Sequence, residues 1–469
     1  MIDTFAIRCN VLKLAFSGQL SQHEVEDGAI DDLLKRVNPN REIKQSEAGP
    51  YEIPENWAWV KLEDLYEINP KVEAADDTDA AFIPMERISA GFSDSFTFEV
   101  QKWSAASKNH TRFADGDVAF AKISPCFENR KSFIATGLPN GIGGGTTELI
   151  ILRQKEMLLR FTYYVTLDQR FIHEGVASYK GTVGQQRVKS DVIKNYMVAV
   201  PPKEEQQRII EKIESIFSAL DTIDTLQSQY QDNLATLKSK IIDAGIQGKL
   251  TEQLPEDGNA EELYQQIQRE RKSQEASGKI KKEDLFPDIE DQSIPFSVPK
   301  TWLWTYLGNV SYIVRGGSPR PIKQYITHDT NGINWIKIGD VEKGGKYIYQ
   351  TNERISPEGE KKSRRVYPGD FLLTNSMSFG RPYISQIEGC IHDGWLLIRN
   401  LNGFDPDYLY YLLSSSYLYG QFTEKASGST VDNLNIDKVK SAMIPLPPLA
   451  EQKRIVAKLE ELLPLCEGK

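Results

Sequence analysis

The chain carries almost the same segment twice. VPPKEEQQRIIEKIESIF begins at Val200 and LPPLAEQKRIVAKLEELL begins at Leu446, a shift of 246 positions. Segments that are copied along one chain usually mark copied structural units. With 469 residues, the chain is also too long for one ordinary hydrophobic core. The repetition therefore predicts two related halves, each with a core of its own.

Other paired segments follow in the same order along both halves. They are GQLSQHEVEDGAIDDLL from Gly18 and GKLTEQLPEDGNAEELY from Gly248, IPENWAWVKL from Ile53 and VPKTWLWTYL from Val298, DGDVAFAK from Asp115 and PGDFLLTN from Pro368, and ELIILR from Glu148 and WLLIRN from Trp395. The second copy of the helical segment stops early, and the first residues of the chain match its missing continuation. We therefore expect a pseudo-two-fold cyclic arrangement in which the two termini lie near each other.

The segments after the two Pro-Pro pairs show a helical pattern. Apolar residues recur there at spacings of three and four, which is typical of the buried stripe of a long helix. This predicted helix seam consists of Ile209, Ile213, Ile216, Leu220, Ile223, Leu234, Leu237 and Ile241 in the first copy and of Ile455, Leu459 and Leu462 in the second. One amphipathic helix cannot bury its own stripe, so we expect the two copies to pack against each other, antiparallel, as in a coiled coil.

The regions between the helices are rich in β-branched and aromatic runs that turn at Gly and Asp, a composition typical of strands. The predicted fold class is α+β, with two mixed α/β domains separated by two long antiparallel helices. The predicted regions are an N-terminal helical segment over residues 1–48 that completes the C-terminal one, a first domain over residues 49–201, a central helical region over residues 202–290, a second domain over residues 291–446, and a C-terminal helix over residues 447–469.

Composition excludes several classes of protein. Hydrophobic residues make up 40% of the chain and charged residues 26%, as in globular proteins. No run approaches the roughly 20 apolar residues of a membrane span, and MIDTFAIRCNVLKLAFSGQL lacks the basic region and the small-residue cleavage site that we would expect of a secretory leader. The 4 cysteines and 5 histidines lack the spacing of zinc ligands or of a disulfide framework. We therefore expect a cytoplasmic protein without a metal site.

Catalytic motifs are not apparent in the sequence. Neither GxxxxGK[ST] nor a GxGxxG that opens a helix is present. The segment SPCF, Ser124 to Phe127, faintly resembles the catalytic tetrad of amino-methyltransferases, but the glycine-rich cofactor motif is missing. We expect no catalytic residue and no bound cofactor in this chain. Two hypotheses about function stay open at this point. The chain could be a protein-interaction scaffold that does not bind DNA, or it could be a stand-alone DNA methyltransferase.

Basic and amide residues follow the predicted strands that begin with Gly-Asp. Arg suits guanine edges, Asn and Gln suit adenine edges, and Lys suits phosphates. Because the net charge is -10, a DNA-binding surface would have to concentrate its basic residues locally. The predicted DNA contacts are Lys122, Asn129, Arg130, Lys131, Lys180, Gln185, Gln186 and Arg187 in the first domain, and Arg315, Lys337, Arg364, Arg365, Asn375, Ser376, Arg381, Asn433 and Asn435 in the second.

Over nearly its full length, the chain resembles the DNA-specificity subunits of type I restriction-modification systems. The two Pro-Pro helix starts, the segment GKLTEQLPEDGNAEELYQQIQRERK, the domain entries IPENWAWVKL and VPKTWLWTYL, and the segments RGGSPRPI, GINWIKIGD, GDFLLTNSMSFGRPYI and IHDGWLLIRN resemble parts of that family. The resemblance implies that the chain is not itself an enzyme and that each domain reads one half of a bipartite, asymmetric site in double-stranded DNA, with the helices setting the spacing. It also implies two modification subunits, which carry S-adenosylmethionine, and motor-nuclease subunits as partners.

Overall fold

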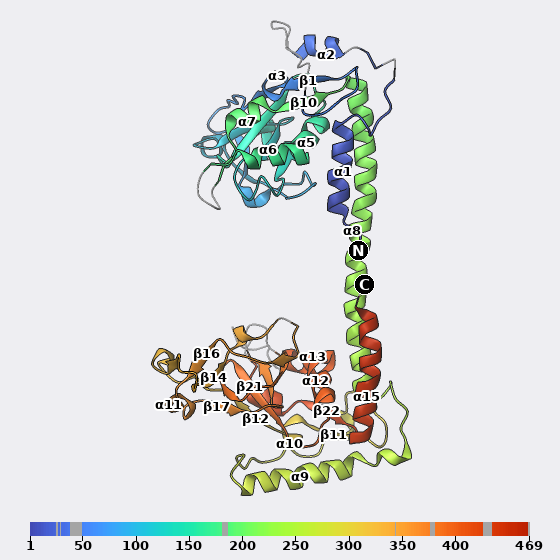
Figure 1. The fold of residues 1–469 in the computed structure, drawn as a ribbon, viewed down its shortest axis with the longest axis vertical. Coiled ribbons are helices and arrows are strands. Elements are labelled where there is room, and N and C mark those ends of the chain that lie inside the picture. The colour runs from blue at the N-terminus through green and yellow to red at the C-terminus, as the bar shows by residue number, and fades with distance from the viewer. Residues whose placement is uncertain are drawn as a thin grey trace. The chain divides into compact units, whose positions relative to one another are not determined.

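The chain forms two compact units, Met1–Ser228 and Gln229–Lys469. The computed structural model in Figure 1 describes residues 1–24, 27–28, 30–37, 49–180, 186–342, 344–375, 380–424 and 434–467. The helix α8, Lys203–Ile246, is 44 residues long and contributes its first part to unit 1 and its last part to unit 2. The sequence-based prediction of two mixed domains and a long helix is therefore confirmed.

Unit 1 combines short strands with helices. Its strands are β1 (Ala58–Lys61), β2 (Tyr66–Ile68), β3 (Asp79–Ile83), β4 (Glu99–Lys102), β5 (Thr111–Ala114), β6 (Val118–Ala121), β7 (Ser132–Ile134), β8 (Ile142–Gly145), β9 (Leu149–Gln154) and β10 (Met197–Val200). Its helices before α8 are α1 (Thr4–Phe16), α2 (Ile30–Val37), α3 (Leu62–Leu65), α4 (Trp103–Ala106), α5 (Leu159–Leu167), α6 (Gln169–Ala177) and α7 (Ser190–Asn195). The sheets have the strand orders β2-β9-β6-β7, β4-β3-β8-β5 and β1-β10.

Unit 2 has a similar plan. Its strands are β11 (Leu303–Tyr306), β12 (Ser311–Arg315), β13 (Ile326–Thr327), β14 (Ile333–Ile336), β15 (Tyr347–Ile348), β16 (Glu353–Ile355), β17 (Arg364–Val366), β18 (Phe371–Thr374), β19 (Pro382–Ser385), β20 (Gly389–Ile391), β21 (Trp395–Asn400) and β22 (Met443–Leu446). Its helices after α8 are α9 (Ala260–Ala276), α10 (Leu307–Val310), α11 (Pro357–Glu360), α12 (Pro406–Ser414), α13 (Ser416–Glu424), α14 (Ile436–Lys440) and α15 (Leu449–Leu462). The sheets have the orders β12-β21-β18-β19-β15, β13-β16-β14-β20-β17 and β11-β22.

The Gly-Asp pattern that opens a strand in each unit is held by an ion pair. Asp117 is 1% exposed and accepts two hydrogen bonds of 2.7 Å from Arg153 on the neighbouring strand β9. Asp370 is 5% exposed and accepts bonds of 2.8 and 2.6 Å from Arg399 on β21. A bidentate Arg–carboxylate pair fixes both side chains, so each pair ties the turn before a central strand to the strand beside it. The duplication therefore extends from the sequence to its buried polar contacts.

The helix α8 has a packing partner in each unit. In unit 1, α1 runs antiparallel to it, with Thr4 donating to Asp224 at 2.5 Å and Arg8 donating to Asp221 at 2.6 Å. In unit 2, α15 packs on the last turns of α8 (Figure 1), where a Cβ on Gly245 would lie only 3.2 Å from the Ile455 side chain. Glycine at this position lets the two helices approach closely. The partner of α8 is thus supplied in two pieces, one in each unit.

Most of the predicted helix seam is buried or half-buried. Ile209, Ile213, Leu220, Ile455 and Leu459 are buried, and Ile216, Ile223, Leu234, Ile241 and Leu462 are half-buried. Leu237 is 47% exposed, so its assignment to the seam is wrong. Ala235, Lys238, Ser239 and Ile242 of α8 line one hollow together with Leu463 and Pro464, and Leu237 is not among its lining residues.

The repeated Glu-Gln-x-Arg sequence at the two helix starts explains why the copied segment is so similar. Glu205 is 0% exposed and accepts hydrogen bonds from the Trp57 indole at 2.9 Å and from the Ser21 hydroxyl at 2.8 Å. Glu451 is 0% exposed and accepts from the Trp302 indole at 2.7 Å and from Gln253 at 2.8 Å. A buried carboxylate has to be hydrogen-bonded, so each one joins a helix start to the entry of its domain.

The glutamine and arginine of the same repeat complete this connection. Gln206 and Gln452 are both 0% exposed; Gln206 accepts from the Leu158 N–H at 3.0 Å, and Gln452 accepts from the Asp405 N–H at 2.8 Å. One ion pair lies close by on each helix, Arg208–Asp27 on α8 and Arg454–Asp257 on α15. The helix starts are therefore anchored in both units by matching polar contacts.

The Arg454–Asp257 pair predicts a dependence of stability on pH. The hydrogen bond from Arg454 lowers the pKa of Asp257 below its ordinary value of 3.8. A carboxyl group with a lowered folded-state pKa stabilises the fold above its unfolded-state pKa, and this contribution is lost as the pH falls through the folded-state pKa. We expect Asp257→Asn to lower the urea midpoint at pH 7 and to have a smaller effect at about pH 3.

The same urea titrations on Asp284→Asn provide the control, because Asp284 is exposed. Its midpoint should equal that of the wild type at both pH values. An Asp257→Asn effect of the same size at both pH values would contradict the assigned role of this ion pair.

Candidate nucleic-acid interface

Two of the predicted contact residues occupy equivalent positions in the two units. Lys122 follows β6, and its N–H donates to the carbonyl of Glu148 at 2.8 Å while its carbonyl accepts from the N–H of Val188 at 3.0 Å. Asn375 follows β18, and its N–H donates to the carbonyl of Gly394 at 3.0 Å while its carbonyl accepts from the N–H of Leu434 at 2.8 Å. Each unit thus brings three loops together at the same end of its central strand.

In unit 1, most of the predicted residues gather at this loop cluster. Isolated β-bridges join Arg187 to Lys180 and to Ile123, and the N–H of Ser124 donates to the carbonyl of Gln186 at 2.9 Å. The exposed members are Asn129, Lys180 and Arg187, the half-buried members are Lys122, Lys131 and Gln186, and Gln185 lies outside the described residues. The Lys131 ammonium donates to the carbonyl of Met85 at 2.7 Å, which ties the loop to the segment after β3.

Glu148 is a residue that the sequence did not single out. Both of its carboxylate oxygens accept hydrogen bonds from the Arg187 Nε and Nη2 atoms at 2.7 to 3.1 Å. The hydrogen bonds from Arg187 lower the pKa of Glu148, so the carboxylate is ionised at neutral pH. Glu148 therefore fixes the orientation of the Arg187 guanidinium within the loop cluster. The position of Glu148 directly before β9, next to a predicted basic loop, could have indicated this role from the sequence.

Arg130 is not available as a DNA contact, so its prediction is corrected. The residue is 4% exposed, and its guanidinium donates to the carbonyl of Leu167 at 2.9 Å and to Gln169 at 2.5 Å. It also lies 5.0 Å from the ring centroid of Phe5 and 5.3 Å from that of Phe92. Arg130 therefore joins α1 to the α5–α6 connection inside unit 1.

In unit 2, the predicted residues are more dispersed. Arg315, Arg364, Arg381 and Asn435 are exposed, while Ser376 and Asn433 lie outside the described residues. Lys337 pairs with Glu353 at 2.7 Å, and Arg365 pairs with Glu388 at 2.8 Å and also with Glu360. The Asn435 side chain caps α14 by accepting from the Asp437 N–H at 2.7 Å.

The side chain of Asn375 has a structural role, which corrects its prediction as a base contact. Asn375 is 2% exposed, and its amide donates to the carbonyl of Asp393 at 2.8 Å. The same carbonyl accepts from Arg315 Nε at 3.1 Å, while the Asp393 carboxylate accepts from Ser318 at 2.8 Å. Asp393 therefore organises the loop cluster of unit 2.

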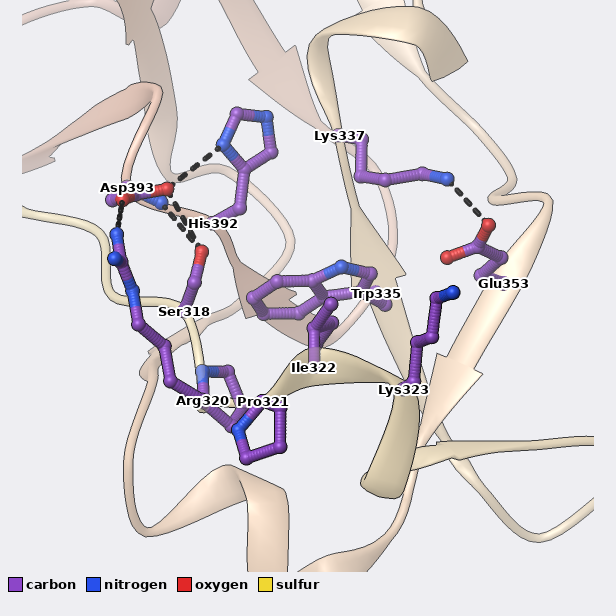
Figure 2. Close-up of a pocket in the computed structure, with 11 residues that line it drawn as sticks. Ser318, Arg320, Pro321, Ile322, Lys323, Trp335, Lys337, Glu353, His392 and Asp393 are labelled. Carbon is purple, nitrogen blue, oxygen red and sulfur yellow. Dashed lines mark hydrogen bonds and ion pairs between the residues drawn. The ribbon is translucent and has the colours of Figure 1, made fainter.

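A hollow of about 740 Å³ opens beside Asp393. Figure 2 shows Trp335 and Ile322 at its centre, with the Arg320–Asp393 pair on one side and the Lys337–Glu353 pair on the other. Of its lining residues, the sequence pointed to Lys337 alone and missed Ser318, Arg320, Lys323, Trp335 and His392. The segment RGGSPRPI stood out as a motif, but the sequence did not indicate that it folds over Trp335.

The phenylalanine of the SPCF segment, Phe127, is packed into the core of unit 1, whereas Ser124 and Cys126 are half-buried and Pro125 is exposed. Phe127 is 2% exposed, and its ring contacts those of Phe171 and Tyr179 at centroid distances of 5.7 and 6.5 Å. The Ser124 hydroxyl donates to Glu128 at 2.8 Å. These contacts give the segment a role in packing.

Neither a metal cluster nor a membrane span is found in the described ranges. Over residues 1–467, apart from the gaps stated above, no three His, Cys, Asp or Glu side chains are grouped so that they could hold a metal ion. Among the helices of the described residues, none is long and apolar enough to cross a bilayer.

Comparisons with known proteins point to a single family. The model of the type I restriction modification DNA specificity domain matches residues 54–230 and again residues 299–466. The EcoAI specificity subunit of Escherichia coli is 28% identical over 548 residues, covering 99% of this chain and 90% of that protein. The EcoEI specificity subunit of the same organism is 28% identical over 544 residues, with the same coverage.

A solved structure shares the fold. It was solved to explain complex assembly and conformational transition of the type I R-M system, and the match has a TM-score of 0.61 at 20% identity, covering 89% of this chain and 92% of that one. The two matched domains account for most of the chain, and each contains a loop cluster described above. The chain therefore belongs to the family of type I restriction-modification DNA specificity subunits, the non-catalytic DNA-recognition component of these systems, and it carries two specificity domains.

Proposed function

We propose that the two specificity domains read the two halves of a bipartite, asymmetric site in double-stranded DNA. In this proposal, α8 with its partners α1 and α15 sets the gap between the half-sites and docks two modification subunits. Those subunits would supply S-adenosylmethionine and the methyl transfer, and motor-nuclease subunits would join for cleavage. This chain would hold no cofactor, so S-adenosylmethionine should show no heat of binding to the isolated chain.

The strongest support for two different half-sites comes from one observation. The loop clusters occupy equivalent positions, but they present different chemistry. Unit 1 has Lys122, Lys180 and the Arg187–Glu148 pair, whereas unit 2 has Arg315, Arg320 and the Asp393 carboxylate. Because base edges are read by matched donors and acceptors, unlike clusters favour unlike sequences.

The charge of the chain is consistent with shared binding. A net charge of -10 leaves phosphate contacts to local basic groups. We therefore propose that the isolated chain binds DNA weakly, with a steep dependence on salt, and that the modification subunits contribute the remaining affinity.

The test is methylome sequencing of strains that carry this chain with its modification subunit. We expect Arg187→Ala to relax the sequence requirement of one half-site and leave the other unchanged, because the loss of a specific base contact costs on the order of 1–3 kcal/mol of discrimination. The change in unit 2 is Arg381→Ala, because the Arg381 side chain is exposed directly before β19. It should relax the opposite half-site.

Lys194→Ala serves as the control, because Lys194 is exposed on α7, which packs against α3. Its methylome should match that of the wild type. If Arg187→Ala and Arg381→Ala relaxed the same half-site, the assignment of one half-site to each domain would be wrong.

A further inference from the structure

The hollow of unit 2 is lined mainly by carbon and is bordered by charge. Pro319, Pro321, Ile322 and Trp335 form its walls, and Trp335 is 2% exposed. In Figure 2 the two ion pairs stand on opposite sides of Trp335 and Ile322. Ligand pockets are typically lined by apolar and aromatic side chains, with a few polar or charged groups that fix the orientation of the ligand.

The charges at the border favour an anion. Arg320, Lys323 and Lys337 face two carboxylates, those of Glu353 and Asp393. Arg320 and Lys337 pair with these carboxylates at 3.2 and 2.7 Å. Within the described part of the chain, Lys323 has no ion-pair partner, and Figure 2 shows its ammonium on the same side as Lys337.

The walls of the hollow are already ordered. The Ser318 hydroxyl donates to the Asp393 carboxylate at 2.8 Å. The His392 ring lies between the N–H groups of Ile338 and Gly394, at 3.1 and 2.7 Å. Burial lowers the pKa of His392, so its ring is neutral at pH 7 and can meet an uncharged heterocycle without desolvating a charge. A pre-formed site reduces the entropy lost on binding.

The hollow is also continuous with the loop cluster. The carbonyl of Asp393 accepts from Asn375 at 2.8 Å and from Arg315 at 3.1 Å, and the Asp393 side chain borders the hollow. A ligand in the hollow would therefore lie next to the loops that we assign to DNA.

We propose that this hollow binds one nucleotide, with its base against Ile322 and the neighbouring prolines and its phosphate on Lys323. The chemistry fits two sources, a nucleotide of the second half-site turned out of the duplex or a free mononucleotide. The first source rests on the proposed function, and the second does not. Turning a base out of the duplex costs a few kcal/mol, which the hollow would have to offset.

The first arm of the test uses the complex of this chain with its modification subunit. Duplexes carry 2-aminopurine at successive positions of the second half-site, and fluorescence reports unstacking. We expect a rise at one position that Ile322→Trp abolishes by filling the hollow. Tyr349→Trp adds a similar ring at a residue that is 68% exposed in the same unit and should leave the rise unchanged. A rise that persists in Ile322→Trp belongs to the modification subunit.

The second arm measures binding of the four deoxynucleoside monophosphates to the full chain by equilibrium dialysis. Binding that Lys323→Ala weakens about tenfold or more would assign the hollow to free nucleotides. Lys323 is exposed, so this variant should fold even if Ile322→Trp does not, and circular dichroism checks both. In the first arm, Lys323→Ala should lower the salt slope of DNA binding by about one, as for a lost phosphate contact.

The outcomes separate the two proposals. If the complex binds its site but shows neither an Ile322-dependent rise nor mononucleotide binding, the nucleotide proposal is overturned and the proposed function stands. If no site-specific DNA binding occurs, the proposed function fails, and the dialysis arm alone decides whether the hollow binds a nucleotide.

Discussion

Glu451→Ala is expected to lower the free energy of unfolding of unit 2 by roughly 3 kcal/mol, because it leaves buried donors without an acceptor. The carboxylate is 0% exposed and accepts from Trp302 at 2.7 Å, from Gln253 at 2.8 Å and from Thr251 at 3.1 Å. The Trp302 indole, itself buried, cannot turn to water without opening the contact between α15 and the entry of the domain. Urea unfolding followed by tryptophan fluorescence measures the loss, and Glu205→Ala should have the matching effect on unit 1.

A double-mutant cycle distinguishes the hydrogen bonds from simple loss of packing. Trp302→Phe removes the indole N–H and keeps an aromatic ring. If the bond between Trp302 and Glu451 carries the effect, Glu451→Ala should cost less in the Trp302→Phe background than in the wild type. Glu461→Ala, an exposed change on the same helix, is the control. A Glu451→Ala loss no larger than that of Glu461→Ala would refute the role of the buried carboxylate.

The residues that make these buried contacts could be identified from the sequence, because the contacts are duplicated in the two halves. The pairing of DGDVAFAK with PGDFLLTN and of ELIILR with WLLIRN placed each Asp and its Arg partner in matched segments. The first Pro-Pro pair, Pro201-Pro202, indicated the start of the long helix, which the structure places at Lys203–Ile246. Features that depend on local pattern, such as helix limits and strand runs, could therefore be predicted.

The candidate site was less predictable, because the role of a polar side chain depends on partners that are distant in sequence. Arg130 and Asn129 are neighbours in one loop, but Arg130 is buried by Phe5 and Phe92, while Asn129 is exposed. No local sequence pattern indicates that one of these neighbours is buried and the other exposed. Asn375 likewise follows a strand, as expected of a residue that contacts DNA bases, but its side-chain amide donates to the carbonyl of Asp393.

The helix seam shows an intermediate case. Spacings of three and four identified the apolar residues of α8, and most of them are buried or half-buried. The spacing could not say where along α8 a partner helix is present. The hydrogen bonds from the start of the chain reach α8 at Gln227, and Leu226 and Tyr230 are 58% and 54% exposed. Periodicity describes one helix, whereas burial depends on the second.

An insertion of four residues between positions 229 and 232 of α8 is expected to change the DNA target of the modification complex. Four residues lengthen a helix by about 6 Å and rotate the part of the chain beyond the insertion by about 40°. Consecutive base pairs are about 3.4 Å apart along the duplex. We therefore expect the gap between the half-sites to grow by one or two base pairs, with both half-site sequences unchanged and the original sites no longer methylated.

The insertion point is suited to this test because residues 228–233 of α8 are exposed, so extra residues disturb no buried contact in either unit. The matched control replaces residues 229–232 by four alanines, which alters the same surface and keeps the length. Methylome sequencing should return the original gap for the control and a longer gap for the insertion. If the insertion methylates the original sites as efficiently as the control, helix length does not set the spacing. If the insertion instead changes the sequence of a half-site, α8 takes part in base recognition. We do not expect this result.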